Sequence, residues 1–123
     1  MDSISRSISL SIYRRKYHIA HRDEVRSRKN RLRRERLAWI DKYKAKRGCV
    51  DCGESDPVCL DLDHREPERK VDGLGKMVDA GFSMERIKAE VDKCEVRCSN
   101  CHRKRHAIER RVALLALTQT TQQ

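Results

Sequence analysis

The 123-residue chain contains few of the residues that build a large hydrophobic core. It has one Trp and one Phe, and only 37% of its residues are hydrophobic, whereas 39% are charged. So little apolar surface can hardly offset the conformational entropy lost on folding. The length favours one domain, or one small domain with an arm. A core this poor usually requires disulfides or a bound metal.

Long hydrophobic runs are also absent. No apolar run approaches the roughly 20 residues needed to cross a bilayer. The first dozen residues alternate Ser with Ile or Leu and include Arg6, which is not the continuous apolar segment of a secretory signal peptide. A Ser- and Arg-rich start also resembles an organelle transit segment, but Asp2 and the strict alternation count against that interpretation. We therefore expect no membrane association and a cytoplasmic location, where thiols stay reduced.

Four of the six cysteines form two CxxC pairs, Cys49-Val-Asp-Cys52 and Cys98-Ser-Asn-Cys101. In a reducing compartment, this pairing is typical of metal binding, and the spacing suits tetrahedral Zn²⁺. Such a site supplies on the order of 10 kcal/mol of folding free energy. We predict that the four cysteines bind a structural zinc ion. Cys59 and Cys94 lie outside the pairs, and we expect them to be packing residues.

The positive charge is concentrated in two segments. Residues 14–47 contain 15 Lys or Arg against 4 Asp or Glu, residues 48–96 carry a net charge of −6, and residues 97–111 carry +5. An acidic centre between basic segments favours a hard cation held against a polyanion. A solvated helix is the alternative, but so many uncompensated cations favour a phosphate backbone as the partner. The residues expected to contact nucleic acid are Arg28, Arg31, Arg33, Arg34, Arg97, Arg103, Lys104 and Arg105.

The expected elements follow from residue patterns. Residues 13–46 lack Pro and Gly and predict one long helix, or two, ending at Gly48. Residues 58–63 alternate between Val or Leu and Cys or Asp, which predicts a half-buried strand with Val58 on its inner face. Residues 65–82 predict a loop with a short helical turn at 76–80. We expect one helix from Ser83 to Lys93, another from about residue 100 to 117, and a frayed tail.

Asp63-His64 lies between the two cysteine pairs, and His102 directly follows Cys101. A lone Asp-His pair at a strand end is more often structural than catalytic. Here, however, a zinc ion joining the two pairs would bring the strand end close to the start of the last helix. Asp63 and His102 are therefore candidate ligands for Mg²⁺, Mn²⁺ or a similar ion, which leaves His64 free to act as a base.

The order CxxC, LDxDH and KCxVxCxNCHR resembles the HNH endonucleases, the ββα-metal or His-Me finger group, and most closely their small zinc-containing phage and bacterial forms. The resemblance covers about residues 48–106. It implies an α+β fold with a zinc-stapled ββα-metal nuclease domain, which we place at 48–117. Before that domain, the residue patterns predict a flexible stretch at 1–12 and a basic helical DNA-binding arm at 13–47. Residues 118–123 would be a disordered tail.

The resemblance also implies roles for individual residues. Cys49, Cys52, Cys98 and Cys101 would bind zinc, His64 would be the general base, and a catalytic Mg²⁺, Mn²⁺ or Ni²⁺ would be held by Asp63, His102 and, as in some members, His106. One departure concerns Lys93, which stands where the family pattern has an Asn that braces the loop orienting the base.

The activity that the resemblance implies is one-metal hydrolysis of a DNA phosphodiester, leaving 5′-phosphate and 3′-hydroxyl ends. Its partners would be double-stranded DNA and, by family context, a phage terminase or a second copy of the chain, in the cytoplasm of a bacterial host cell. Two alternatives remain: a non-catalytic zinc-ribbon DNA-binding protein, and a structural zinc module that binds a partner through the apolar end of the last helix.

Overall fold

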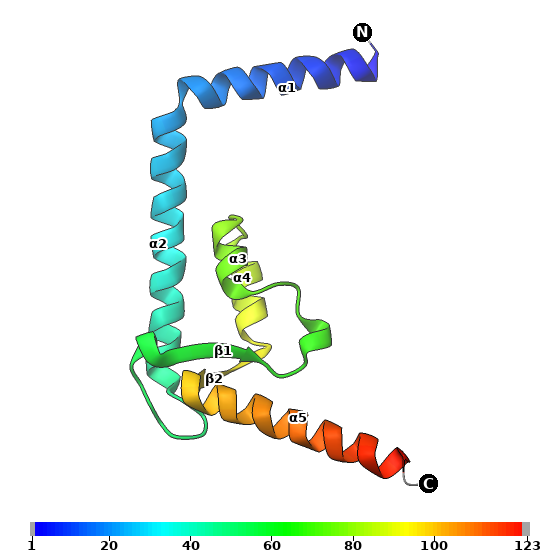
Figure 1. The fold of residues 1–123 in the computed structure, drawn as a ribbon. Coiled ribbons are helices and arrows are strands. Elements are labelled where there is room, and N and C mark those ends of the chain that lie inside the picture. The colour runs from blue at the N-terminus through cyan, green and yellow to red at the C-terminus, as the bar shows by residue number, and fades with distance from the viewer. Residues whose placement is uncertain (1, 122–123) are drawn as a thin grey trace. The chain divides into compact units, whose positions relative to one another are not determined.

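The computed structural model describes residues 2–121 and has an α+β fold, which confirms the expected fold class (Figure 1). Within residues 2–121, two strands form one antiparallel sheet, and five α-helices precede, separate or follow these strands along the chain. In chain order the elements are α1 (Ser3–Ala20), α2 (Arg22–Arg47), the 3₁₀ turn η1 (Pro57–Cys59), β1 (Leu60–His64), the 3₁₀ turn η2 (Pro67–Arg69), α3 (Leu74–Asp79), α4 (Met84–Val91), β2 (Cys94–Cys98) and α5 (Ser99–Thr121).

The chain divides into two compact units, Met1–Glu35 and Arg36–Gln123. The first contains α1 and the beginning of α2. The structure has a helix where we expected a flexible amino terminus, because Asp2 caps it by accepting a hydrogen bond from the Ser5 N–H at 2.7 Å. The helix ends at His21, whose backbone N–H and ring Nδ1 both lie 2.9 Å from the Tyr17 carbonyl oxygen. Residues 13–46 therefore contribute to two helices.

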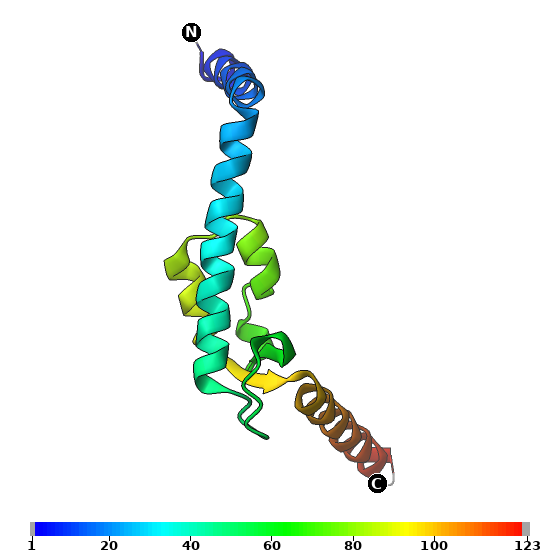
Figure 2. The same cartoon turned by 90° about the vertical axis from the view of Figure 1, so that its left-hand side faces the viewer.

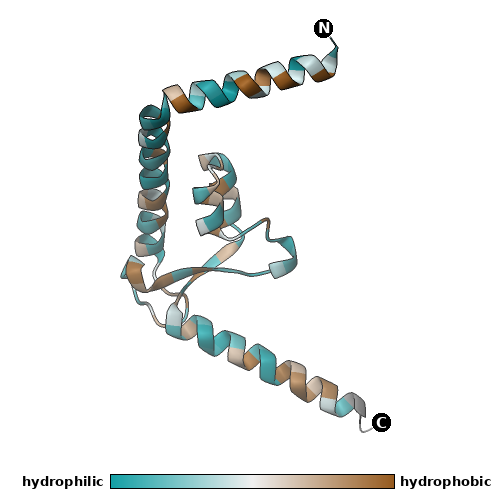
Figure 3. Ribbon diagram, turned by 45° about the horizontal axis from the view of Figure 1, so that its top comes forward, coloured by the Kyte–Doolittle hydropathy of each residue, from teal (hydrophilic) through white to brown (hydrophobic). Residues whose placement is uncertain are grey.

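The second unit packs its core on the carboxyl-terminal part of α2. Ile40 of α2 is buried with Met77 and Val78 of α3 and with Ile87 and Val91 of α4. Figure 2 shows α3 and α4 beside this part of α2. Hydropathy colouring shows why the contact is confined to a narrow stripe, since most of α2 is hydrophilic (Figure 3).

The sheet connects this core to α5. β1 pairs antiparallel with β2, with Leu60 opposite Cys98 and His64 opposite Cys94, and α5 starts immediately after β2. Leu60 and Val96 form a second buried cluster with Cys49 and Cys98. Residue patterns alone did not predict β2, although the resemblance implied a second strand. Cys94 is buried as expected and starts this strand, three residues after the end of α4.

The start of β1 differs from the sequence prediction. Val58 is 91% exposed, and Cys59 is also exposed instead of packed. The cause is the turn η1, in which Pro57 fixes the backbone and the Asp56 carboxylate accepts a hydrogen bond from the Val58 N–H at 3.1 Å. The strand therefore begins only at Leu60.

The later helices follow the prediction closely. Ser83 caps α4 by accepting a hydrogen bond from the Arg86 N–H, and α3 lies at the predicted short turn. α5 starts at Ser99 and continues to Thr121, so the described part of the expected tail, residues 118–121, is helical. The rest of that tail and Met1 lie outside the described residues.

Candidate metal centre

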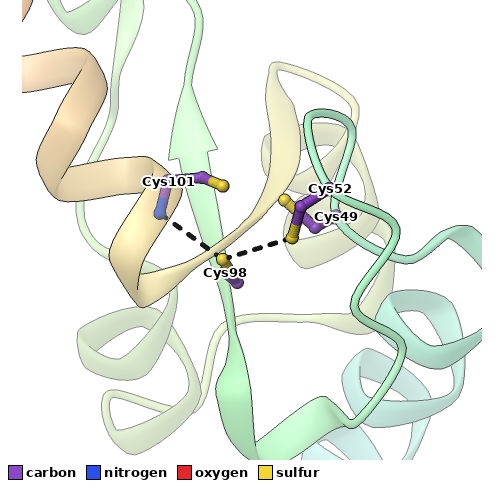
Figure 4. A group of neighbouring side chains, drawn as sticks. All are labelled: Cys49, Cys52, Cys98 and Cys101. Carbon is purple, nitrogen blue, oxygen red and sulfur yellow. Dashed lines mark hydrogen bonds between the residues drawn. The ribbon is translucent and has the colours of Figure 1, made fainter.

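The four paired cysteines meet in one cluster, as predicted (Figure 4). Cys49 and Cys52 follow the end of α2, Cys98 ends β2, and Cys101 lies in the first turn of α5. Their Sγ atoms all lie within 4.8 Å of one another. The site therefore joins three segments that the small core alone would hold weakly.

Local backbone geometry places the cysteines of both CxxC pairs in the cluster. α2 stops at Gly48, which has φ +69°, and a Cβ there would lie 3.2 Å from the Glu54 carbonyl oxygen. The Cys49 N–H donates to that same oxygen at 2.7 Å, and the Gly53 N–H donates back to the Cys49 carbonyl. On the other side, the Cys101 N–H donates to Cys98 Sγ at 3.4 Å. Glycine at position 48 is thus required by both conformation and space.

Two thiols of the cluster have pKa values shifted in opposite directions. Burial alone would raise the pKa of Cys49, but backbone N–H groups of Cys98 and Cys52 lower it to about 6. By contrast, hydrogen bonding with Cys98 and burial raise the pKa of Cys101 to about 12. Four thiolates this close ionise together only if a cation neutralises them. The donor set therefore fits a zinc ion, with all four sulfurs as ligands.

A second group contains Asp63, His102 and His106. One ligand atom from each lies within 4.8 Å of the others. Asp63 at the end of β1 is buried, with its Oδ1 3.5 Å from His102 Nε2, and the rings of His102 and His106 lie 4.7 Å apart. The structure thus brings together the three residues expected to hold the catalytic ion. One carboxylate and two imidazoles suit a divalent ion such as Mn²⁺ or Ni²⁺.

Two arginines share the Asp63 carboxylate. Arg97 Nη1 and Arg105 Nη1 donate to Oδ2 of Asp63 at 3.0 and 2.5 Å. The side chain of Arg97 is only 11% exposed and also pairs with Asp51 and Glu95. Burial alone would lower the pKa of Arg97, but these carboxylates raise it. Arg97 therefore contacts carboxylates in this structure, and its expected contact with phosphate stays a prediction. Arg103 and Lys104 are exposed on α5.

Asp61 belongs to the same region and was missed from sequence. Its Oδ2 lies 3.2 Å from His102 Nδ1 and 3.4 Å from the Ser99 hydroxyl. A carboxylate on Nδ1 favours the tautomer whose Nε2 lone pair is free for a metal. The signal was present, because Asp61 and Asp63 are two residues apart on one strand and share a face.

His64, the expected base, is not among these three residues. It is buried, and its Nε2 lies 2.9 Å from Oε1 of Glu90, a fully buried residue of α4 that sequence analysis also missed. Lys93 Nζ donates to Oε2 of Glu90 at 2.9 Å and to the Arg69 carbonyl oxygen at 3.1 Å. Lys93 therefore makes a bracing contact to the loop after β1 from the position where the family pattern has Asn.

These elements define an α+β protein with a four-cysteine cluster whose donor set fits zinc and with an adjacent Asp-His-His group. A two-stranded antiparallel sheet followed by a helix and stapled by four cysteines is consistent with an HNH domain without identifying one. Comparison with family models, curated proteins and solved structures found no match to this chain. Across residues 2–121, the helices lack the combination of length and apolarity that crossing a membrane requires.

Proposed function

We propose that this protein is a metal-dependent DNA endonuclease of the HNH type. The observation that supports it best is the convergence of Asp63, His102 and His106 at the end of β1 and on the helix that carries Cys101. A purely structural zinc module has no use for a second group of ligands. The buried carboxylate and the two histidines instead provide a place for a reactive divalent ion.

The residues would divide the reaction between them. Asp63, His102 and His106 would hold the ion, which when bound supplies positive charge near the leaving 3′ oxygen. His64 accepts a proton from the attacking water, whose oxygen bonds to phosphorus in line as the bond from phosphorus to the 3′ oxygen breaks, and the departing 3′ oxygen takes up a proton from solvent water. The products are a 5′-phosphate and a 3′-hydroxyl.

Binding to duplex DNA would rest on exposed basic residues. On α5, Arg103 and Lys104 lie beside the Asp-His-His group in sequence, and the exposed cations of α2 include Arg28, Arg31, Arg33 and Arg34. The first unit also has a hollow of about 550 Å³, whose lining includes Arg15, Arg22, Arg26 and Lys29. Such cations contact phosphates and give affinity that falls steeply with salt. A phage or mobile-element role beside a terminase, or with a second copy of the chain, rests on the resemblance alone.

The test is incubation of the zinc-loaded protein with supercoiled plasmid in EDTA, Mg²⁺, Mn²⁺ or Ni²⁺. We expect nicked or linear plasmid only with an added metal ion, and loss of cleavage in zinc-retaining His64→Ala and Asp63→Asn variants. Glu85→Gln, which replaces an exposed carboxylate of α4 outside both clusters, is the control and should cleave normally. An intact plasmid under every condition, with salt-sensitive DNA binding retained, would favour the non-catalytic zinc-ribbon protein.

A further inference from the structure

Glu90 is a carboxylate with almost no access to water. It is 1% exposed and lies on the inner face of α4 beside Ile87 and Val91. A buried acid in a core this small is costly unless hydrogen bonds satisfy it. Packing alone therefore does not explain why an acid occupies this buried position.

Three donors surround this carboxylate. Oε1 lies 3.0 Å from the Val71 backbone N–H and 2.9 Å from His64 Nε2, and Oε2 accepts from Lys93 Nζ at 2.9 Å. Burial alone would raise the pKa of Glu90, but the hydrogen bonds from Lys93, Val71 and His64 lower it overall. The carboxylate is therefore ionised and can only accept hydrogen bonds.

An acceptor at 2.9 Å determines which ring nitrogen of His64 carries the proton. Because Glu90 has no proton to donate, Nε2 must be the N–H that donates to it. In the neutral ring, Nδ1 is then the nitrogen with the free lone pair. This is the arrangement that a base requires, one nitrogen anchored and the other available.

We propose that Glu90 is a positioning residue that holds His64 in the Nε2–H tautomer and leaves Nδ1 as the basic nitrogen. The catalytic role of Glu90 rests on the nuclease proposed above, whereas the hydrogen bond between Glu90 and His64 does not depend on it. Glu90 acts through His64 and need not touch the substrate.

Lys93 completes the arrangement. Its ammonium group bonds both Glu90 Oε2 and the Arg69 carbonyl oxygen, and the Arg65 N–H donates to the Lys93 carbonyl at 3.0 Å. The same carboxylate that orients His64 is thus attached to the loop that follows it. The Lys93–Glu90 pair thereby performs the bracing that the family pattern assigns to an Asn.

The first measurement is the tautomer of His64, from long-range ¹H–¹⁵N NMR of the full-length, zinc-loaded protein at about pH 8, above the usual imidazole range. The wild-type spectrum should show Nε2–H. In Glu90→Gln that preference should disappear, because an amide beside Lys93 can turn its NH₂ group toward the ring. Glu85→Gln, an exposed residue of the same helix, is the matched control. An Nδ1–H ring in the wild type would overturn the proposal even if Glu90→Gln did not fold.

The second measurement is plasmid cleavage. Glu90→Gln should lower kcat by about 10–100-fold with KM changed less than about twofold. When His64→Ala is already present, adding Glu90→Gln should lower the residual rate no further, because Glu90 acts on the reaction only through His64. An equal loss in both backgrounds would mean that Glu90 is merely structural and would overturn the proposal. Failure of the wild type to cleave would overturn the nuclease, whereas the NMR spectrum tests the Glu90 contact in either case.

Discussion

At the scale of single residues, arginines donate hydrogen bonds to the Asp63 carboxylate that the proposed metal ion would need as a ligand. Arg105 donates to the same buried carboxylate that would ligate the ion, and its positive charge repels a dication. Arg105→Gln should therefore strengthen Mn²⁺ binding by about tenfold, which corresponds to roughly 1–2 kcal/mol of relieved repulsion. Titration of the zinc-loaded protein with Mn²⁺, followed by electron paramagnetic resonance without DNA, measures this affinity. Arg110→Gln on the same helix is the control, and weaker binding in Arg105→Gln would contradict the assigned site.

The six cysteines should differ sharply in reactivity. In the zinc-loaded protein, iodoacetamide should label Cys59 first, because it is exposed and outside the cluster, although hydrogen bonding with Glu54 raises the pKa of its thiol. Cys94 should resist labelling until unfolding, because burial raises its pKa to about 11. The four cluster cysteines should react only after chelation. Mass spectrometry of proteolytic digests measures the labelling of all six cysteines. Labelling of exposed Cys52 as fast as Cys59 would mean that the cluster holds no zinc.

Sequence patterns identified the candidate metal ligands better than the residues that orient them. The paired cysteines stand out because the spacing within each CxxC pair is local along the chain, and Asp63 and His102 stand out because they are direct neighbours of His64 and Cys101. Asp61 and Glu90 do not, because each owes its role to a histidine about 26 to 41 residues away. An acid on an apolar helix face, as at Glu90, is the signal that could have indicated a buried partner.

At the scale of elements, the cysteine cluster attaches the end of α2 to β2 and α5. A two-stranded sheet is marginal by itself, and this one has a small core behind it. Removing zinc with a chelator, or Cys98→Ser, should therefore unfold the second unit, since a zinc ion bound by the four cysteines would supply on the order of 10 kcal/mol. Thermal unfolding followed by circular dichroism measures the loss.

Cys59→Ser is the matched control for that experiment, because it removes a thiol outside the cluster and should leave the Tm unchanged. An unchanged Tm in Cys98→Ser as well would show that the hydrophobic contacts alone hold the fold. The free energy assigned to zinc would then be wrong.

Elements with strong local signals were predicted well, and those that depend on a partner were not. α4 begins at the Ser83 cap, and α3 lies at the expected turn. β2 was not recognised from its pattern, because five residues with two cysteines form a strand only when β1 lies opposite. The segment before Tyr13 was expected to be flexible, yet its Asp2 cap and lack of Gly and Pro allow a helix.

At the scale of the whole molecule, charge and chemistry are divided between the two units. The cysteine cluster and the Asp-His-His group both belong to Arg36–Gln123, as do Leu37, Trp39, Ile40 and Tyr43 of the core. Arg28, Arg31, Arg33 and Arg34 all lie in Met1–Glu35. If these cations bind phosphates, DNA affinity depends on the first unit and cleavage on the second, so the two properties can be separated.

Removal of residues 1–35 tests this separation. The shortened protein should keep its zinc and a Tm within a few degrees of the full chain, because the core contacts of α2 begin at Leu37. Its DNA affinity should fall, and the slope of log K against log salt should decrease by about 0.9 for each phosphate that the shortened protein no longer neutralises. Metal-dependent cleavage should persist at low salt. Binding with an unchanged salt slope would instead place the phosphate contacts on α5, around Arg103 and Lys104.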